Sequence, residues 1–569
     1  MAAGKVRAAK QANSSLAGPL KEIVLKEHGL WIVVGILLIS GCSSADYKAR
    51  ADKEVYDIIR RKQMQALGID QAFTIDRDYT DPLIGLPRTQ PEPLPNEQPR
   101  PAVVLSMAQT LEIAGKKNRE YQSRKEDVYL TALALTMAEY EWGPIFSGGA
   151  STEYTKTSGD ETLGGGLALG FSKLLSDGTR VGVDLTSDLL MHLVENPREA
   201  AWSLISAAIT KPLWRGARKR IAQENLLQAR YDVLYSIRSF ARYRKSFAVS
   251  IAASYYRVLQ ERDSVDNAWN NYRNLIQARE RTEMMARAGR LPEFQVDQAR
   301  QNELRAKDRY IRSVQGYEQS LDQFKIQLGL PTDEAVFLDP DELVALRDGG
   351  IIHPSISADD AVAVALEARL DLATAYDRIT DATRKVEVAE NGLAPDIDLV
   401  LTSSVPTHRN RPNNFRTDFG TYTGGIDVDL PLNRRSERNT YRRALINRER
   451  SERDASLAAD EVKLDVRDAW RKLQEARASY DIQQTSLILA RRRVESTTLL
   501  LQAGRADTRD LLESRDALLE AQNALTGALI DHTIARLEFW RDIGVLEVNE
   551  KGLWKENYDL DKSGNTAEP

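Results

Sequence analysis

Residues that could do chemistry are few in this chain, and the single cysteine, Cys42, is the most informative of them. Cys42 follows an apolar run from Leu30 to Ile39, which is too short to span a bilayer because a spanning helix needs about 20 apolar residues. Several lysines and an arginine precede the run. A basic region, a short apolar region and small residues at its end indicate a secretory signal. We therefore expect residues 1–41 to be a cleaved leader.

The junction "ISGC" at 39–42 resembles the bacterial lipobox, in which the cysteine receives lipid and becomes the first mature residue. Ser43 is not the aspartate that usually retains such lipoproteins in the inner membrane. The alternative is a buried apolar thiol, the usual environment of a free cysteine. The sequence neighbours of Cys42 are glycine and serine, which favours lipidation. The leader is longer than usual, so a downstream start codon is an alternative.

Other candidates for catalysis or metal binding are sparse. The chain has 78 Lys+Arg against 83 Asp+Glu, a net charge of -5, which does not suggest a nucleic-acid partner. No phosphate loop, nucleophile elbow or zinc-protease motif is present. The histidines show no metal-ligand spacing and are expected to be solvated or in loops. They are His28, His192, His353, His408 and His532. We predict no catalytic residue, no metal site and no cofactor, and hence a binding or conduit role.

The positions of glycine and proline reveal a tandem duplication, because both residues interrupt helices. Residues 217–288 contain neither, and residues 432–503 contain neither; each run is 72 residues long. Each run follows a Pro-Leu pair and ends in Ala-Gly-Arg, at 288–290 and 503–505. Recurring units of this kind indicate a repeat architecture.

These landmarks predict a domain organisation. It consists of a signal peptide at 1–41, a lipid-anchored, Pro-rich extended segment at 42–104, repeat 1 at 105–331, a linker at 332–355, repeat 2 at 356–546 and a polar tail at 547–569. Each repeat is predicted as a helix, strands, a long helix and a further helix. The last three lie at 145–211, 213–288 and 292–328 in repeat 1, and at 396–430, 432–503 and 505–543 in repeat 2.

The glycine-free runs predict long coiled-coil helices, since 72 helical residues extend about 108 Å at 1.5 Å per residue. In repeat 2 a mostly apolar seam advances in alternating steps of four and three, as in a left-handed coiled coil. Its positions are Val462, Val466, Ala469, Leu473, Ala476, Tyr480, Gln483, Leu487, Ala490, Val494, Thr497 and Leu501.

Before each long helix, the spacing of apolar residues changes from a helical period to every second residue. In repeat 2, aspartates alternate with aliphatic residues through 396–401 and 425–430. This pattern fits strands of a membrane barrel with lipid on one face and water on the other. A soluble sheet would alternate similarly. Repeat 1 also carries a Gly-rich insertion at 164–188, predicted as a hairpin with its turn at "SDGT".

The chain resembles the TolC-like outer-membrane factors of efflux pumps and type I secretion, in their lipoprotein branch. The resemblance covers about 100–546, and its strongest phrases are "ARAGRLPEFQVDQAR" and "LQAGRADTRDLLESRDALLEAQNAL". It implies an α+β membrane protein, a homotrimer whose antiparallel coiled-coil helices form a periplasmic α-barrel tunnel. It also implies a transmembrane antiparallel β-barrel with about four strands per protomer and 12 in the trimer. The hairpin at 164–188 is taken as an extension; if it joins the wall, the trimer has eighteen. The implied partners are a periplasmic adaptor and an inner-membrane transporter.

The resemblance also implies site residues. The residues of the two helix tips would dock the adaptor; they are Gly289, Arg290, Leu291, Gly504 and Arg505. Asp510 and Glu513 match the acidic ring of the closed periplasmic entrance. Gln295 and Ala506 depart from the family pattern, so the latch of that entrance is left to Arg505, Asp507, Arg509 or Glu293.

Three function classes remain at this point. The leading one is a passive outer-membrane export channel of a Gram-negative bacterium, lipid-anchored at Cys42. The second is a lipid-anchored periplasmic coiled-coil scaffold whose strands form a small soluble sheet. A lipoprotein hydrolase is a distant third, because no nucleophile, base and metal set is visible in the sequence.

Overall fold

The computed structural model describes residues 43–77, 83–84, 86–90, 93–95, 98, 101–158, 160–192, 199–430, 432–549, 552 and 554–555. The predicted leader and Cys42 lie outside these ranges. The chain forms two compact units, residues 1–58 and 59–569. None of the described helices is long and apolar enough to cross a membrane.

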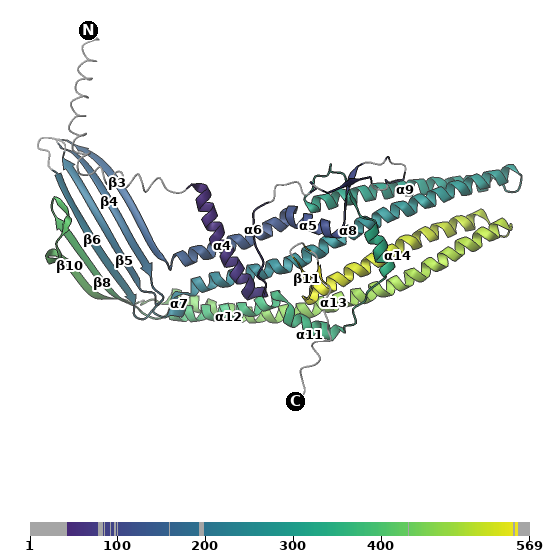
Figure 1. Ribbon diagram of the computed structural model, residues 1–569. Helices are drawn as coiled ribbons and strands as arrows, with labels where there is room; N and C mark the ends of the chain where they lie inside the picture. Colours follow the sequence, from purple (N-terminus) through teal and green to yellow (C-terminus); the bar gives the residue numbers. More distant parts are fainter. Residues whose placement is uncertain are drawn as a thin grey trace, which may run out of the picture. The chain divides into compact units, whose positions relative to one another are not determined.

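Within residues 59–569 the same series of elements occurs twice (Figure 1). The first series is α5 (Met107–Lys117), α6 (Arg119–Tyr140), β3 (Pro144–Thr157), β4 (Asp160–Leu174), β5 (Arg180–His192), β6 (Glu199–Pro212), α7 (Lys219–Ala222), α8 (Glu224–Arg287) and α9 (Glu293–Leu328). The second is α11 (Ala358–Ala368), α12 (Leu370–Asn391), β8 (Asp396–His408), β9 (Arg411–Phe415), η1 (Thr417–Phe419), β10 (Thr421–Asp429), α13 (Arg435–Gln502) and α14 (Thr508–Ile543).

The long helices start later than the Pro-Leu pairs suggest. α8 begins at Glu224 instead of residue 213, because the Leu213 N–H still bonds the Ile397 carbonyl at 2.7 Å and so belongs to the sheet. Gly216, with φ 81°, then turns the chain toward α7. With 64 residues, α8 is about 96 Å long.

The segments outside the repeats have more structure than expected. α4 (Ser44–Leu67) is a helix where an extended segment was predicted, because the first proline after Cys42 is Pro82. The linker contains β7 (Val336–Leu338) and α10 (Asp341–Gly349). β2 (Ala102–Leu105) pairs with β7 in parallel and with β1 (Arg88–Thr89) in an antiparallel arrangement. After α14, β11 (Glu547–Val548) pairs with β12 (Trp554–Lys555).

One antiparallel sheet collects the strands of both repeats, in the order β10-β8-β6-β5-β4-β3, with short β9 beside β8 (Figure 1). Six long strands therefore share this sheet, where the resemblance implies about four barrel strands per protomer. The inserted hairpin is β4 and β5, which pair along their whole lengths with β3 and β6. Its turn lies at the predicted site, where Gly178 has φ 85° and the Leu175 N–H bonds the Thr179 carbonyl.

The helices pack through the predicted seam. All of its positions on α13 are buried or half-buried, and Val466 and Leu473 are almost wholly buried. They form an apolar core with residues of α11 and α14. A larger core joins α5, α8, α9, β2 and β7, and in it the Tyr255 hydroxyl donates a hydrogen bond to the Leu105 carbonyl at 3.0 Å. These cores set the spacing of the helices that carry the candidate site.

Candidate functional site at the helix tips

The two helix tips have the same backbone geometry. Gly289 and Gly504 both have φ 68°, a left-handed conformation that glycine accepts without steric cost. In the first tip the Arg290 N–H bonds the Met285 carbonyl at 2.9 Å, and in the second the Arg505 N–H bonds the Leu500 carbonyl at 2.8 Å. In both, the glycine N–H bonds a carbonyl three residues back. This is the Schellman motif, which ends a helix and frees the chain to turn back.

Side chains link the two tip hairpins to each other. The Thr508 hydroxyl, which is almost wholly buried, donates to the Gln295 Oε1 at 3.2 Å. Nearby, Leu275, Ala306 and Leu512 form a small apolar cluster between α8, α9 and α14. Gln295 thus has a defined contact across the tips. The sequence could not indicate this contact, because its partners lie 213 residues apart.

Asp510 and Glu513 lie on one exposed face of the first turns of α14. Each already has a local partner. The Asp510 carboxylate accepts the Asp507 N–H at 3.1 Å and so caps the helix, and the Glu513 carboxylate accepts from the Arg509 Nε at 2.8 Å. The Glu513 side chain is 50% exposed, so this ion pair adds little stability and can open. Both carboxylates are therefore accessible to ions from solvent.

The remaining tip residues are mostly exposed. Gly289, Arg290, Gly504 and Arg505 are exposed, and Leu291 is half-buried. A Cβ at either glycine would meet no atom within 4 Å. A substitution there would act through backbone strain and would not create a clash inside the protomer.

Farther along α14, Arg515 is a half-buried cation. Burial lowers the pKa of its guanidinium. Its Nε has no hydrogen-bond partner among the described residues.

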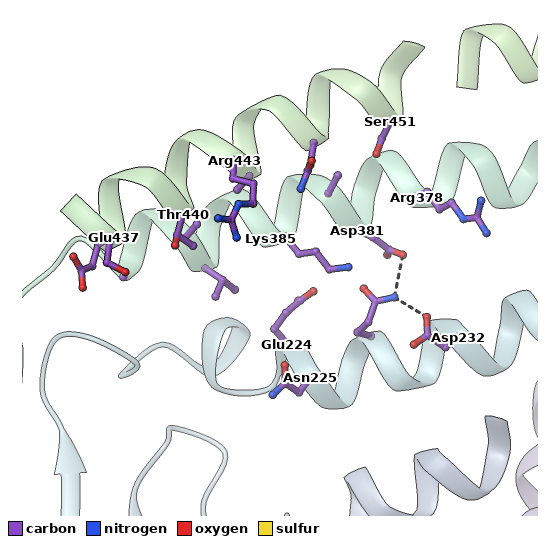
Figure 2. Close-up of a pocket in the computed structure, with 18 of the residues that line it drawn as sticks. Glu224, Asn225, Asp232, Arg378, Asp381, Lys385, Glu437, Thr440, Arg443 and Ser451 are labelled. Atoms are coloured by element: carbon purple, nitrogen blue, oxygen red, sulfur yellow. Dashed lines mark hydrogen bonds between the residues drawn. The ribbon is translucent and has the colours of Figure 1, made fainter. Parts of the chain in front are cut away.

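A second polar region lies between α8, α12 and α13, where a cavity of about 840 Å³ opens (Figure 2). Glu224 and Asp232 project from α8, Arg378 and Asp381 from α12, and Arg443 from α13. The lining is charged, which suits a surface in contact with water.

Ion pairs and hydrogen bonds organise this cavity wall. Arg384 contacts Glu224 at 3.0 Å and Asp381 at 2.7 Å. The Tyr235 hydroxyl donates to Asp381 at 2.7 Å. Burial raises the pKa of Tyr235, and the carboxylate of Asp381 raises it further. The tyrosine therefore stays neutral at physiological pH and acts here as a hydrogen-bond donor.

One histidine differs from expectation. His532 is wholly buried, and its Nε2 lies 3.3 Å from the Nδ1 of His353. The Nε2 of His353 lies 2.9 Å from the amide nitrogen of Gln474. The expectation that the histidines are solvated or in loops is wrong for His532, because α14 buries this face against α13 and the linker, whereas His353 lies in the linker loop. Burial, with His353 and Arg536 nearby, lowers the pKa of His532 to about 4. Among the described residues, no group of three His, Cys, Asp or Glu side chains could hold a metal ion.

Comparison with known proteins agrees with this geometry. Residues 361–539 match the family described as outer membrane efflux protein. The fold is similar to that of the CmeC outer membrane channel of Campylobacter jejuni, with TM-score 0.57 and 14% identity over 86% of this chain and 95% of that one. It is also similar to the outer membrane protein VceC of Vibrio cholerae, with TM-score 0.56 and 13% identity over 77% of this chain and 96% of that one. No curated protein sequence matches the chain.

The match to the outer membrane efflux protein family thus covers residues 361–539, and the fold of the chain is similar to that of outer membrane channels. The family match lies within repeat 2, and the structural similarity extends over both repeats.

Proposed function

We propose that this protein is the outer-membrane channel of a tripartite efflux pump or a type I secretion system. In this proposal it is a passive homotrimeric duct through the outer membrane and periplasm of a Gram-negative bacterium, and it docks to a periplasmic adaptor and an inner-membrane transporter. One observation carries the proposal. A sheet with one apolar, exposed face is joined by helices of 64 and 68 residues to two tips of identical geometry.

The sheet supports the membrane assignment. Large apolar side chains lie exposed on one face, such as Phe146 at 74% and Ile426 at 64%. A soluble protein rarely leaves such a face uncovered. The second candidate, a periplasmic scaffold without a channel, would have to cover this face with protein.

The sheet edges support an oligomer. β3 and β10 each have one neighbour in the sheet, and open strand edges are not tolerated in lipid. Several copies must therefore close the barrel together, and the family resemblance favours three. Native mass spectrometry in detergent should detect a trimer. A monomer or dimer would overturn the proposal, and a trimer that forms no pore in planar bilayers would favour the scaffold.

The acidic ring is proposed at Asp510 and Glu513. In a trimer six such carboxylates would focus a negative potential along the tunnel axis. Single-channel recording with a trivalent cation on the periplasmic side tests this. The variant Asp510→Asn/Glu513→Gln keeps the helix-capping oxygen and removes the charge, so block should disappear. Asp308→Asn/Glu318→Gln on α9 is the matched control and should leave block unchanged. Equal block in all three proteins would refute the ring.

The lipid anchor is proposed at Cys42, outside the described residues. Wild-type protein should incorporate a fatty-acid analogue, and Cys42→Ala should not. Labelling that survives in the variant would refute the anchor. Export should weaken only partly, because the barrel would still hold the protein in the membrane.

A further inference from the structure

We propose that the inserted hairpin forms part of the barrel wall, so that three protomers close an eighteen-stranded barrel whose lumen admits bulkier cargo than twelve strands would. The inference rests on the proposed trimeric channel and deepens it. Barrel diameter grows about linearly with strand number, so the lumen would be roughly 1.5 times as wide.

The hairpin strands are long enough to be wall strands. β4 has 15 residues and β5 has 13, against 14 each for β3 and β6. A tilted strand needs about 9–11 residues to cross a bilayer. The pairing has no gaps, since β4 pairs with β3 from Pro144 to Thr157 and β5 pairs with β6 from Arg180 to Met191. A twelve-stranded wall would require both pairings to break and β3 to pair with β6 instead.

The register continues both faces of the sheet through the hairpin. One row of adjacent residues crosses all six strands and contains only small or polar side chains. It is Ser147, Gly170, Asp184, Ser206, Ser404 and Thr421. The next row on the other face is mainly aliphatic. It includes Leu169, Leu185, Ile205 and Val405. A hairpin that lay outside the wall would not need an apolar face and a polar face that continue those of the neighbouring strands.

Glycines in β4 leave the water-facing side open. A Cβ on Gly170 would lie 2.8 Å from the Asp184 Oδ1, and one on Gly166 would lie 3.3 Å from the Asp188 Oδ1. The aspartates of β5 therefore lie over bare backbone of β4. From Gly164 to Ser172 of β4 and from Gly182 to Asp188 of β5, this face carries no side chain larger than aspartate, so the hairpin widens the sheet there without filling the extra space.

The two outer strands allow closure with any number of copies. β3 follows α6 and runs away from the helices, while β10 runs toward α13. β10 of one protomer can therefore pair in an antiparallel manner with β3 of the next. Six strands from each of three copies alternate in direction around the whole ring.

Thiol labelling tests the wall position of the hairpin in the full-length protein in liposomes. Asp184→Cys and Leu185→Cys probe β5, and Ser206→Cys and Ile205→Cys probe the neighbouring β6, all in a Cys42→Ala background. A water-soluble maleimide should label positions 184 and 206 at least tenfold faster than 185 and 205. Protection of 205 with rapid labelling of 185 would overturn the inference and leave the channel proposal standing. Rapid labelling of all four positions would overturn the channel proposal itself.

Cryo-electron microscopy of the full chain in nanodiscs then counts the strands. Eighteen strands with threefold symmetry are expected, and a closed barrel of twelve would refute the inference. Width is measured separately by adding polyethylene glycols of graded size on the extracellular side of single channels. Polymers about 1.5 times larger in radius should enter the barrel of the full chain than enter a variant lacking residues 160–192. An equal size limit would refute the wider lumen.

Discussion

At the helix tips the two repeats use the same turn, with Gly289 and Gly504 at the same φ and the same hydrogen bonds. At the sheet the repeats differ, because repeat 1 supplies four long strands and repeat 2 supplies two. The tip turn is a local backbone motif that few sequences can make. A sheet accepts another hairpin wherever two edges can separate and pair with it. The helix tips are thus constrained by backbone geometry, whereas the sheet can be enlarged by another hairpin.

The largest effects should come from a pair of buried aromatic residues at equivalent places in the repeats. Phe324 and Phe539 each lie five residues before the glycine that ends their helix, and both are almost wholly buried. Phe324→Ala and Phe539→Ala should each lower the free energy of unfolding by about 3–5 kcal/mol, because each leaves a cavity. Denaturant titration of the helical circular dichroism signal measures this. Phe294→Ala, at an exposed site, is the control. Unequal losses would mean that the two cores are not equivalent.

A smaller effect should come from His532, which makes the stability of repeat 2 depend on pH. Its equivalent in repeat 1 is Tyr317. The pKa of His532 is about 4 in the folded protein, against 6.5 ordinarily. The unfolded chain therefore binds a proton between these values that the folded protein does not. The contribution of His532 to the free energy of unfolding is fully present above pH 6.5. It falls by on the order of 3 kcal/mol as the pH drops to about 4.

The test compares unfolding at pH 7.5 and pH 4.5. His532→Phe should lose less stability on acidification than the wild type does, and the variant of the exposed His408, His408→Phe, should behave like the wild type. If His532→Phe loses as much stability on acidification as the wild type does, other groups cause that loss.

The tip glycines should show a cost on the order of 1 kcal/mol or more when replaced, since a branched side chain disfavours positive φ. Gly504→Val and Gly289→Val should still insert and trimerise, yet lose cross-linking to the adaptor. Gly349→Val, at an open site, is the control. Cross-linking and efflux that persist in both tip variants would exclude the tips as the docking site, and loss in only one would show that the equal turns have unequal roles.

The smallest effect should come from a difference between the two tips in the cap of the returning helix. Asp507 caps α14, while its equivalent before α9 is Pro292, which has no side-chain oxygen. Asp507→Ala should cost about 1 kcal/mol or less and speed amide exchange in the first turn of α14. Pro292→Ala should leave exchange at α9 unchanged. Equal changes at both helices would mean that the cap is not what stabilises this turn.

Local patterns in the sequence were sufficient for the repeat, the helix tips and the coiled-coil seam. Glycine at a helix end and a 3.5-residue apolar period act over a few residues, so Gly289, Gly504 and the positions from Val462 to Leu501 could be recognised without tertiary contacts. The alternation of aspartate and aliphatic residues likewise indicated strands.

Only the tertiary structure decided which strands share a sheet and what each site residue contacts. From Gly164 to Gly170 the second face of β4 carries only glycine and alanine, so the sequence shows no polar face there, and only the register with β3 and β5 reveals it. The burial of His532 against His353 depends on residues 179 apart. Such pairings are set by the packing of whole helices and strands, because the free energy that holds them comes from surfaces that are distant in the chain.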